Sequence, residues 1–315
     1  MNTNLQTDLW FIRDKGFVAN YQQDVEQKFI LSNGLITQRS NFEEFCSTES
    51  EIGTFVKGIY SFKNECKQLS LLPDWTSLNI RLNAEQLDLA SCEIIQFNRT
   101  IDMFHGILER NFEIVTAEKH HIEVSVQRFL SLHNPEIAAI KYAVKSVNFA
   151  GRISFLPVID GAFNIEEPEW NVLQSKTQKD VAHLWIQTRK TNLQVCEAMS
   201  YDLFKNNAQI KYNPTKIEKQ KVAGFSLGTD IKEGDSVCVY KFASILNSND
   251  HPYQELTNLA CEKALSAKLT GWNELLEEHI QAWAASWETL TNQTGKELLK
   301  EEIINKFQQN QLLYK

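Results

Sequence analysis

The sequence lacks any long uninterrupted apolar stretch, and this absence limits where the protein can reside. No run of 18 apolar residues occurs among its 315 residues, so no segment is expected to cross a bilayer as a helix. The first residues, MNTNLQTDLWFIRDKGF, lack the basic opening, apolar core and small-residue cleavage site of a secretory signal. We therefore predict a cytoplasmic protein that does not contact membranes.

Clusters of basic residues are missing as well. The chain has 32 Lys and Arg against 40 Asp and Glu, which gives a net charge of −8. Nucleic acids and anionic lipid surfaces attract concentrated positive charge. We therefore predict no nucleic-acid partner, and a neutral small molecule or another protein is left.

Paired cysteines and the common catalytic motifs are also absent. The six cysteines, at positions 46, 66, 92, 196, 238 and 261, form no C-x-x-C pair, and reduced, buried thiols are expected rather than disulfides or zinc ligands. No G-x-S-x-G, G-x-x-x-x-G-K, G-x-G-x-x-G or H-E-x-x-H occurs. His120 and His121 are adjacent at the start of an expected strand, so they should face opposite sides and share no metal. Acidic pairs such as Glu43-Glu44 and Glu277-Glu278 are neighbours in sequence, which rarely gives the facing geometry of sugar hydrolysis.

What the sequence does contain is a long series of strand patterns. Its 43% apolar and 10% aromatic residues suffice for a large packed core. Apolar and polar residues alternate over 78–83, 122–127 and 140–145, which predicts half-buried strands. More continuous apolar runs begin at 153, 183, 193 and 237 and predict strands covered on both faces. Because no long amphipathic helix separates these strands, the pattern predicts a mainly β protein, a large antiparallel β-sandwich, over a parallel βαβ fold.

The pattern changes at Asn247, after which helices are expected. Pro252 suits a first helical turn. The apolar stripe of this helix consists of Leu256, Leu259, Leu265 and Leu269. Gly271 can interrupt it, and a second stripe consists of Trp272, Leu276, Ile280, Trp283 and Trp287. We interpret the tryptophans as core, with a platform for a ligand as the alternative.

A last helix is expected from about Lys296 to Tyr314, with Leu299, Ile303 and Phe307 on one face. This apolar face should pack on the sandwich, on a second copy or on a further domain.

The stretch from Phe29 to Glu44 combines a turn signal with a group of polar residues. Asn33-Gly34 between apolar runs predicts a hairpin, because both residues accept positive φ. The polar residues that follow are Arg39, Asn41, Glu43 and Glu44. A polyhydroxylated ligand or a buried polar corner would use such donors and acceptors, and both interpretations remain open.

Asp74 and Trp75 follow Pro73 at another expected turn. An aromatic face beside a carboxylate would suit a sugar platform, whereas a tryptophan that plugs the end of the sandwich is the alternative. The acidic segment 162–170 is expected to form an exposed loop.

Five separated segments, taken in order, resemble the N-terminal domain of glycoside hydrolase family 65. They are S-N-G-L-I-T-Q-R-S-N-F-E-E (32–44), G-T-F-V-K-G-I-Y (53–60), L-P-D-W-T-S-L (72–78), R-x-I-D-M-x-x-G-I-L-x-R (99–110) and R-F-L-S-L-H-N-P (128–135). The resemblance covers roughly residues 5–290, and the W-x-x-x-W of Trp283 and Trp287 is similar to the family's linker. Ser32 departs from the family, which usually has glycine there.

The resemblance implies three regions. Residues 1–248 would form a galactose-mutarotase-like β-sandwich (supersandwich), 249–290 a helical linker, and 291–315 the start of an (α/α)6 catalytic barrel. In this family the barrel carries the phosphate site and the catalytic glutamate, which lies in an E-Y-H pattern. Neither the E-Y-H pattern nor the phosphate site is found in these residues. We therefore expect no catalytic residue, no metal and no cofactor in this chain, with phosphate as a co-substrate only if the intact enzyme is a phosphorylase.

The family includes maltose, trehalose and kojibiose phosphorylases and related hydrolases, which implies an α-linked glucose disaccharide as the substrate of the intact enzyme. The sandwich would support the barrel and the rim of its active site, and it could form a homodimer. The candidates for the rim or the domain junction are Arg39, Asn41, Glu43, Glu44, Asp74 and Trp75. Two alternatives remain open, a stand-alone carbohydrate-binding module and a mutarotase-like sugar epimerase.

Overall fold

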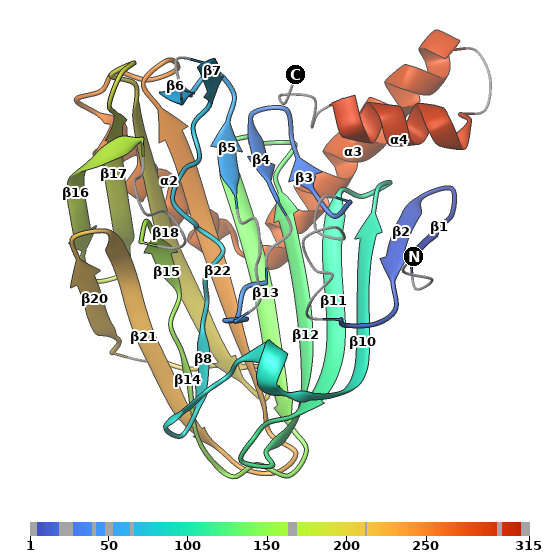
Figure 1. Cartoon of the computed structure of the whole chain (residues 1–315), viewed down its shortest axis with the longest axis vertical. Coiled ribbons are helices and arrows are strands. Elements are labelled where there is room, and N and C mark those ends of the chain that lie inside the picture. The colour runs from blue at the N-terminus through green and yellow to red at the C-terminus, as the bar shows by residue number, and fades with distance from the viewer. Residues whose placement is uncertain are drawn as a thin grey trace.

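A computed structural model describes residues 5–18, 28–39, 42–47, 53–63, 66–162, 169–211, 213–294 and 298–309. In these residues the chain is mainly β, as predicted, and three helices follow the strands. Figure 1 shows the long strands as one curved sheet, with shorter strands in front of it and helices α2 and α3 behind it. None of the helices in the described part of the chain is both long and apolar enough to span a membrane.

The largest sheet has 11 strands, and its neighbouring strands pair antiparallel. From one edge to the other they are β1 (Leu5–Thr7), β2 (Phe11–Asp14), β10 (Glu93–Asp102), β11 (Ile107–Val115), β12 (His121–Leu130), β13 (Ile137–Ser146), β22 (Ser236–Asn247), β18 (Gln194–Lys205), β17 (Ala182–Thr188) and β16 (Trp170–Thr177), and β19 (Ala208–Gln209) pairs with β18. The antiparallel pairing confirms the prediction made from the alternating patterns.

Smaller antiparallel sheets cover the inner face of this sheet. One has the order β15 (Val158–Asp160), β21 (Val222–Ile231), β14 (Gly151–Phe155), β8 (Ile80–Leu82) and β9 (Glu85–Gln86), with β20 (Thr215–Lys219) paired to β21. The others join β3 (Leu31–Ser32), β4 (Ile36–Gln38) and β5 (Thr54–Val56), and β6 (Tyr60–Lys63) with β7 (Cys66–Leu69). A short 3-10 helix, η2 (Leu89–Ser91), precedes β10. Side chains from both layers share one buried apolar cluster, so the fold is a sandwich.

Helix α2 (Leu256–Thr270) packs on the outer face of β18 and β22. The hydroxyls of Ser200 and Ser244 donate hydrogen bonds to carbonyls of this helix at 2.8 and 2.6 Å. The leucine stripe predicted for it is wrong in part, because the Leu269 side chain is 86% exposed. The fully buried positions are Leu256, Ala260, Ala264 and Ala267. Small alanines let the helix approach the sheet closely, and apolar periodicity based on large residues misses such a face.

Helix α3 (Trp272–Thr294) begins directly after Gly271, which ends α2 with a φ of +83°. Trp272, Trp283 and Trp287 are buried, which confirms the core interpretation. The Trp283 ring stacks on that of Trp287, with centroids 5.5 Å apart. Pro252 precedes the first helix, whose first residue is Leu256, so the expected position of Pro252 in the first helical turn was wrong.

Helix α4 (Lys300–Gln309) begins later than predicted, and Leu299 is 60% exposed rather than part of its buried face. Ile303 and Phe307 are buried in the main core, where the Phe307 ring lies 5.6 Å from that of Trp283. Of the three expected packing surfaces, this helix therefore uses the chain's own core. Residues 296–297 and 310–314 of the predicted helix lie outside the described residues.

The cysteines are all free thiols, as predicted, but they are not uniformly buried. Cys196 is fully buried and Cys66 is exposed, while the other four are half-buried. The expectation of buried thiols is thus wrong for Cys66, which lies on the short strand β7.

Candidate functional site

The β3–β4 hairpin is anchored at its turn by Asn33. The backbone N–H of Asn33 donates to the Ile36 carbonyl at 3.2 Å, and its Oδ1 accepts from the N–H groups of Leu35 and Ile36. Its Nδ2 donates to the carbonyls of Ser131 and Pro135, at 2.9 Å each. Because those carbonyls belong to the connection between β12 and β13, Asn33 ties the hairpin to the large sheet.

The predicted hairpin is confirmed, but its turn differs in detail. Only Gly34 has a positive φ, +88°, whereas two positive values were expected for Asn33-Gly34. Asn33 stands one position before the two turn residues, where its side chain closes an Asx turn, so it needs no left-handed conformation.

Glu43 and Glu44 lie inside the sandwich, where their side chains are 1% and 3% exposed. Glu44 accepts hydrogen bonds from Nη1 and Nη2 of Arg110 at 2.6 and 2.7 Å, and one from the Tyr142 hydroxyl at 3.2 Å. Glu43 forms ion pairs with Arg110 and, at 2.9 Å, with Arg128. The planar guanidinium of Arg110 therefore binds two carboxylates at once.

Strand alternation places these arginines on the inner face. Arg110 on β11 lies directly opposite Arg99 on β10, and Arg99 is paired in turn with Asp14 on β2 at 3.2 Å. Like charges at opposite positions of a sheet destabilise it. The carboxylates of Asp14, Glu43 and Glu44 offset this repulsion. We call Asp14, Glu43, Glu44, Arg99, Arg110 and Arg128 the inner charge network.

Aromatic rings complete the surroundings of the inner charge network. The Arg99 guanidinium lies 4.4 Å from the ring centre of Phe29, and that of Arg110 lies 4.6 Å from the ring centre of Phe42. Phe29 and Phe42 are both buried. Cation–π contacts of this kind are strongest where water is excluded, so these rings also stabilise the buried charges.

Electrostatics favour the ionised forms of Glu43 and Arg110 in the inner charge network. Burial alone would raise the pKa of Glu43, but attraction to Arg128 and Arg110 outweighs it and holds that pKa below its usual value. The pKa of Arg110 is raised, because Glu44 and Glu43 outweigh the cost of its burial. Burial and the Glu44 charge both raise the pKa of Tyr142, which remains a neutral donor.

A second polar group surrounds Asp74. Asp74 Oδ1 accepts hydrogen bonds from the N–H and the hydroxyl of Thr76 at 2.9 and 2.6 Å. The buried Lys241 donates from Nζ to the carbonyls of Ser77 and Val158 at 2.8 and 2.7 Å, and burial lowers its pKa to about 7. Burial raises the pKa of the nearby Glu197 well above its usual value. These groups join layers of the sandwich.

Trp75 is fully buried, so the interpretation as an exposed sugar platform is wrong in this structure. The alternative, a tryptophan that plugs the sandwich, agrees with its place in the main core. Arg39 is half-buried, and its guanidinium lies 5.4 Å from the ring centre of Phe55. Asn41 lies outside the described residues, as do residues 163–168 of the predicted acidic loop.

The candidate residues do not form a pair of facing, solvent-accessible carboxyl groups, which sugar hydrolysis requires. Glu43 and Glu44 bind arginines, and Asp74 binds a threonine. The structure brings Glu43 and Glu44 together and places Asp74 close enough to influence Arg128, whereas Arg39 lies apart, directly after β4. The arrangement can hold loops against the sheet but offers no acid and base to a substrate.

A family model with the description "Glycosyl hydrolase family 65, N-terminal domain" matches residues 12–286. The chain belongs to this family. A solved structure has the same fold. It is a human-microbiome protein assigned as a kojibiose phosphorylase, and it matches this chain with a TM-score of 0.80 and 18% identity. The match covers 90% of this chain and 38% of that one.

Several relatives of the family 65 domain are disaccharide phosphorylases. The chain is 26% identical to the α,α-trehalose phosphorylase of Thermoanaerobacter brockii, over 88% of this chain and 39% of that protein. It is 21% identical to the maltose phosphorylase of Bacillus subtilis, over 90% of this chain and 39% of that protein. The chain thus spans less than two fifths of the length of these relatives.

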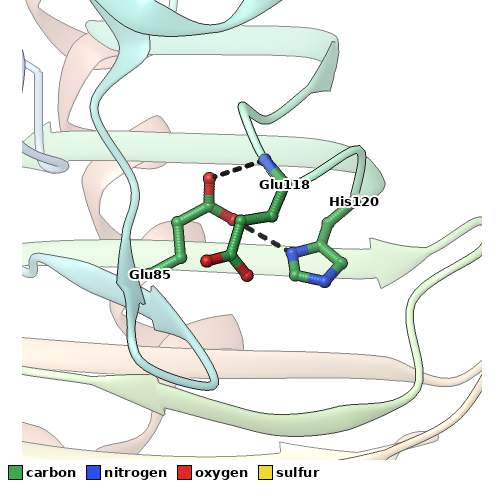
Figure 2. A group of neighbouring side chains, drawn as sticks. All are labelled: Glu85, Glu118 and His120. Atoms are coloured by element: carbon green, nitrogen blue, oxygen red, sulfur yellow. Dashed lines mark hydrogen bonds and ion pairs between the residues drawn. The ribbon is translucent and has the colours of Figure 1, made fainter.

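One possible ligand set in the family 65 domain was missed from the sequence. Glu85, Glu118 and His120 form the single group of potential metal ligands found among the described residues, and Figure 2 shows their side chains converging. The expectation that His120 and His121 do not share a metal agrees with their separate partners, Glu85 and Glu113. The signal that could have found the group is weak, because Glu85 lies 33 residues from Glu118.

Proposed function

We propose that this chain is the non-catalytic domain of a family 65 enzyme that acts on α-linked glucose disaccharides. In this proposal the sandwich supports a catalytic (α/α)6 barrel and helps to form the rim of its active site. The named relatives, which are trehalose, kojibiose and maltose phosphorylases, support the substrate class. Phosphate would then be a co-substrate bound by the barrel.

The inner charge network is the observation that carries the supporting role. The carboxylates of Glu43 and Glu44 form ion pairs with buried arginines and are therefore not available as catalytic groups. These ion pairs hold the segment 42–47 on β11 and β12. At the other end of the β3–β4 hairpin, Asn33 holds its turn on the β12–β13 connection. A hairpin fixed at both ends is suited to hold a rim residue such as Arg39 in place.

Activity assays with the 315-residue chain test the proposal. Incubation with maltose, trehalose and kojibiose, with and without phosphate, should release neither glucose nor glucose phosphate. Turnover that rises in proportion to the chain's concentration, and survives repurification, would refute the non-catalytic role.

A second candidate function is carbohydrate binding on the outer face of the large sheet. An open groove of about 370 Å³ lies over β10 to β13. Its floor is made by the small or polar residues Asn111, Ser125 and Ala143, which lie opposite one another on adjacent strands. Lys145 and Glu123 border it and form an ion pair at 3.1 Å. Hydrogen-bond donors and acceptors around this polar groove could bind the hydroxyl groups of a sugar.

Titration calorimetry with maltose and longer α-glucosides separates this candidate from the first. Saturable binding that Asn111→Ala weakens, and that Lys216→Ala on the distant strand β20 leaves unchanged, would support it. Absence of binding up to tens of millimolar would remove it, and the supporting role would be unaffected.

A further inference from the structure

Three potential metal ligands meet where the six-stranded sheet approaches the β11–β12 hairpin. Glu85 comes from β9, whereas Glu118 and His120 come from the turn between β11 and β12 (Figure 2). One carboxylate oxygen of each glutamate and one ring nitrogen of the histidine all lie within 4.8 Å of one another. The ligands therefore reach one point from two different sheets.

Hydrogen bonds fix the Glu85 carboxylate in this position. Its Oε2 accepts from the Thr116 hydroxyl at 2.7 Å and lies 3.0 Å from Nδ1 of His120, and its Oε1 accepts from the backbone N–H of Glu118 at 3.2 Å. Outer contacts of this kind orient the carboxylate ligands of metal sites. Glu85 is thus held in one orientation before any ion binds.

The His120 ring is fixed as well. Its centroid lies 4.5 Å from that of the buried Phe149 in an edge-on arrangement, which leaves Nδ1 directed at Glu85. The side chains of Glu85 and His120 are 13% and 19% exposed, so a bound ion would be only partly in contact with water. Glu118 is exposed, and its carboxylate can move to complete the set.

The local charge is unbalanced in favour of a cation. Among the described residues, no lysine or arginine forms an ion pair with Glu85 or Glu118. The two carboxylates thus stand beside an imidazole without a lysine or arginine partner.

We propose that Glu85, Glu118 and Nδ1 of His120 bind a divalent transition-metal ion, with Zn²⁺ as the best fit. The ion would replace the Nδ1 proton that the hydrogen bond to Glu85 requires, and this proton would be released to solvent. One imidazole and two carboxylates form a ligand set that zinc accepts, with water in a fourth position. Tetrahedral ligands stand about 3.3 Å apart at zinc bond lengths, so the flexible Glu118 side chain must move inward by a small amount. The ion would join β9 to the β11–β12 hairpin and so link the two layers of the sandwich.

Titration calorimetry of the 315-residue chain, treated with a chelator and then dialysed, tests this site with Zn²⁺ alone. We expect one ion per chain, and a Kd raised at least tenfold in both His120→Gln and Glu118→Gln. His121→Gln is the matched control, because His121 pairs with Glu113 at 2.6 Å on the same hairpin without a third ligand. Its Kd should stay within twofold of that of the unmodified chain.

Thermal unfolding gives a second readout that does not depend on calorimetry. Zn²⁺ should raise the Tm of the unmodified chain and of His121→Gln equally, and at the same concentration it should raise the Tm of Glu118→Gln by less. Glu118 is exposed, so this variant should fold normally even if His120→Gln does not. Equal affinity in Glu118→Gln and the unmodified chain, an equal loss in His121→Gln, or no binding at 1 mM Zn²⁺ would each overturn the proposal.

Discussion

His279 on α3 should make the stability of the chain depend on pH. The residue is fully buried, its Nδ1 accepts a hydrogen bond from the Leu132 N–H at 3.1 Å, and its Nε2 lies 3.3 Å from the Gly106 carbonyl. Nε2 must donate to that carbonyl, so the ring is neutral. A proton added at Nδ1 would break the bond to Leu132, which connects α3 to the end of β12.

The size of the effect follows from the pKa. Burial lowers the pKa of His279 from 6.5 to about 4, despite hydrogen bonds from its ring to the Gly106 and His105 backbone. Because the unfolded chain binds this proton more tightly, stability is complete above pH 6.5 and is lost as the pH falls towards 4. At about 1.4 kcal/mol per pKa unit the full loss is about 3 kcal/mol, of which about 2 kcal/mol is reached at pH 5.

Urea denaturation at pH 7.5 and pH 5 measures this loss, with His279→Gln as the comparison. A glutamine can accept from Leu132 and donate to Gly106 but does not titrate, so the variant isolates this one group from the carboxylates. The free energy of unfolding should fall between the two pH values by about 2 kcal/mol more in the unmodified chain than in the variant. An equal fall in both proteins would refute the assignment of the neutral, buried ring.

Three other substitutions have clear expected outcomes in the same denaturation assay. Gly106→Ala should cost about 2 to 3 kcal/mol, because its Cβ would stand 2.0 Å from Nε1 of Trp283 at a φ of +67°; a smaller loss than 0.5 kcal/mol would show that α3 can shift. Glu44→Gln should cost about 3 to 5 kcal/mol, because it leaves the buried Arg110 with one carboxylate; near-neutral stability would contradict the inner charge network. Leu269→Ser should change stability by less than about 0.5 kcal/mol, and a large loss would mean that this exposed side chain is covered in solution.

The strands could be predicted because their signal is local. In β13, Ile140, Tyr142 and Val144 are buried while Lys141 and Lys145 face outwards, as the alternation indicates. The same local logic failed for α2, where the buried face is built from alanines and Leu269 points to solvent. Residue size decides how closely a helix can approach a sheet, and the pattern of large apolar residues does not contain that information.

The site could be predicted only in part, because its partners are far apart in sequence. Glu43 and Glu44 were singled out, but Arg110 lies 67 and 66 positions away, and only strand register brings it to them. One signal was available. Arg99 lies two positions from the buried Phe97, and Arg110 lies two positions from the buried Phe112, so each arginine shares the inner face with its phenylalanine. A charged residue at a core position requires a buried partner of opposite charge, so both arginines predict a nearby buried carboxylate.

The burial of these charges also decides which rim candidate can meet a ligand. A partly formed inner charge network would be unstable, because burying a guanidinium without its carboxylate partner costs several kcal/mol of folding free energy. The segment 42–47 and strands β10 to β12 must therefore form together, and the anchor at Asn33 fixes the other end of the hairpin to the same sheet. Arg39 lies between these two anchors and is half-buried, unlike the buried Glu43, Glu44, Asp74 and Trp75. Among the described candidates, Arg39 is thus the one whose side chain is exposed enough to meet a ligand, and the proposed rim role would depend on it.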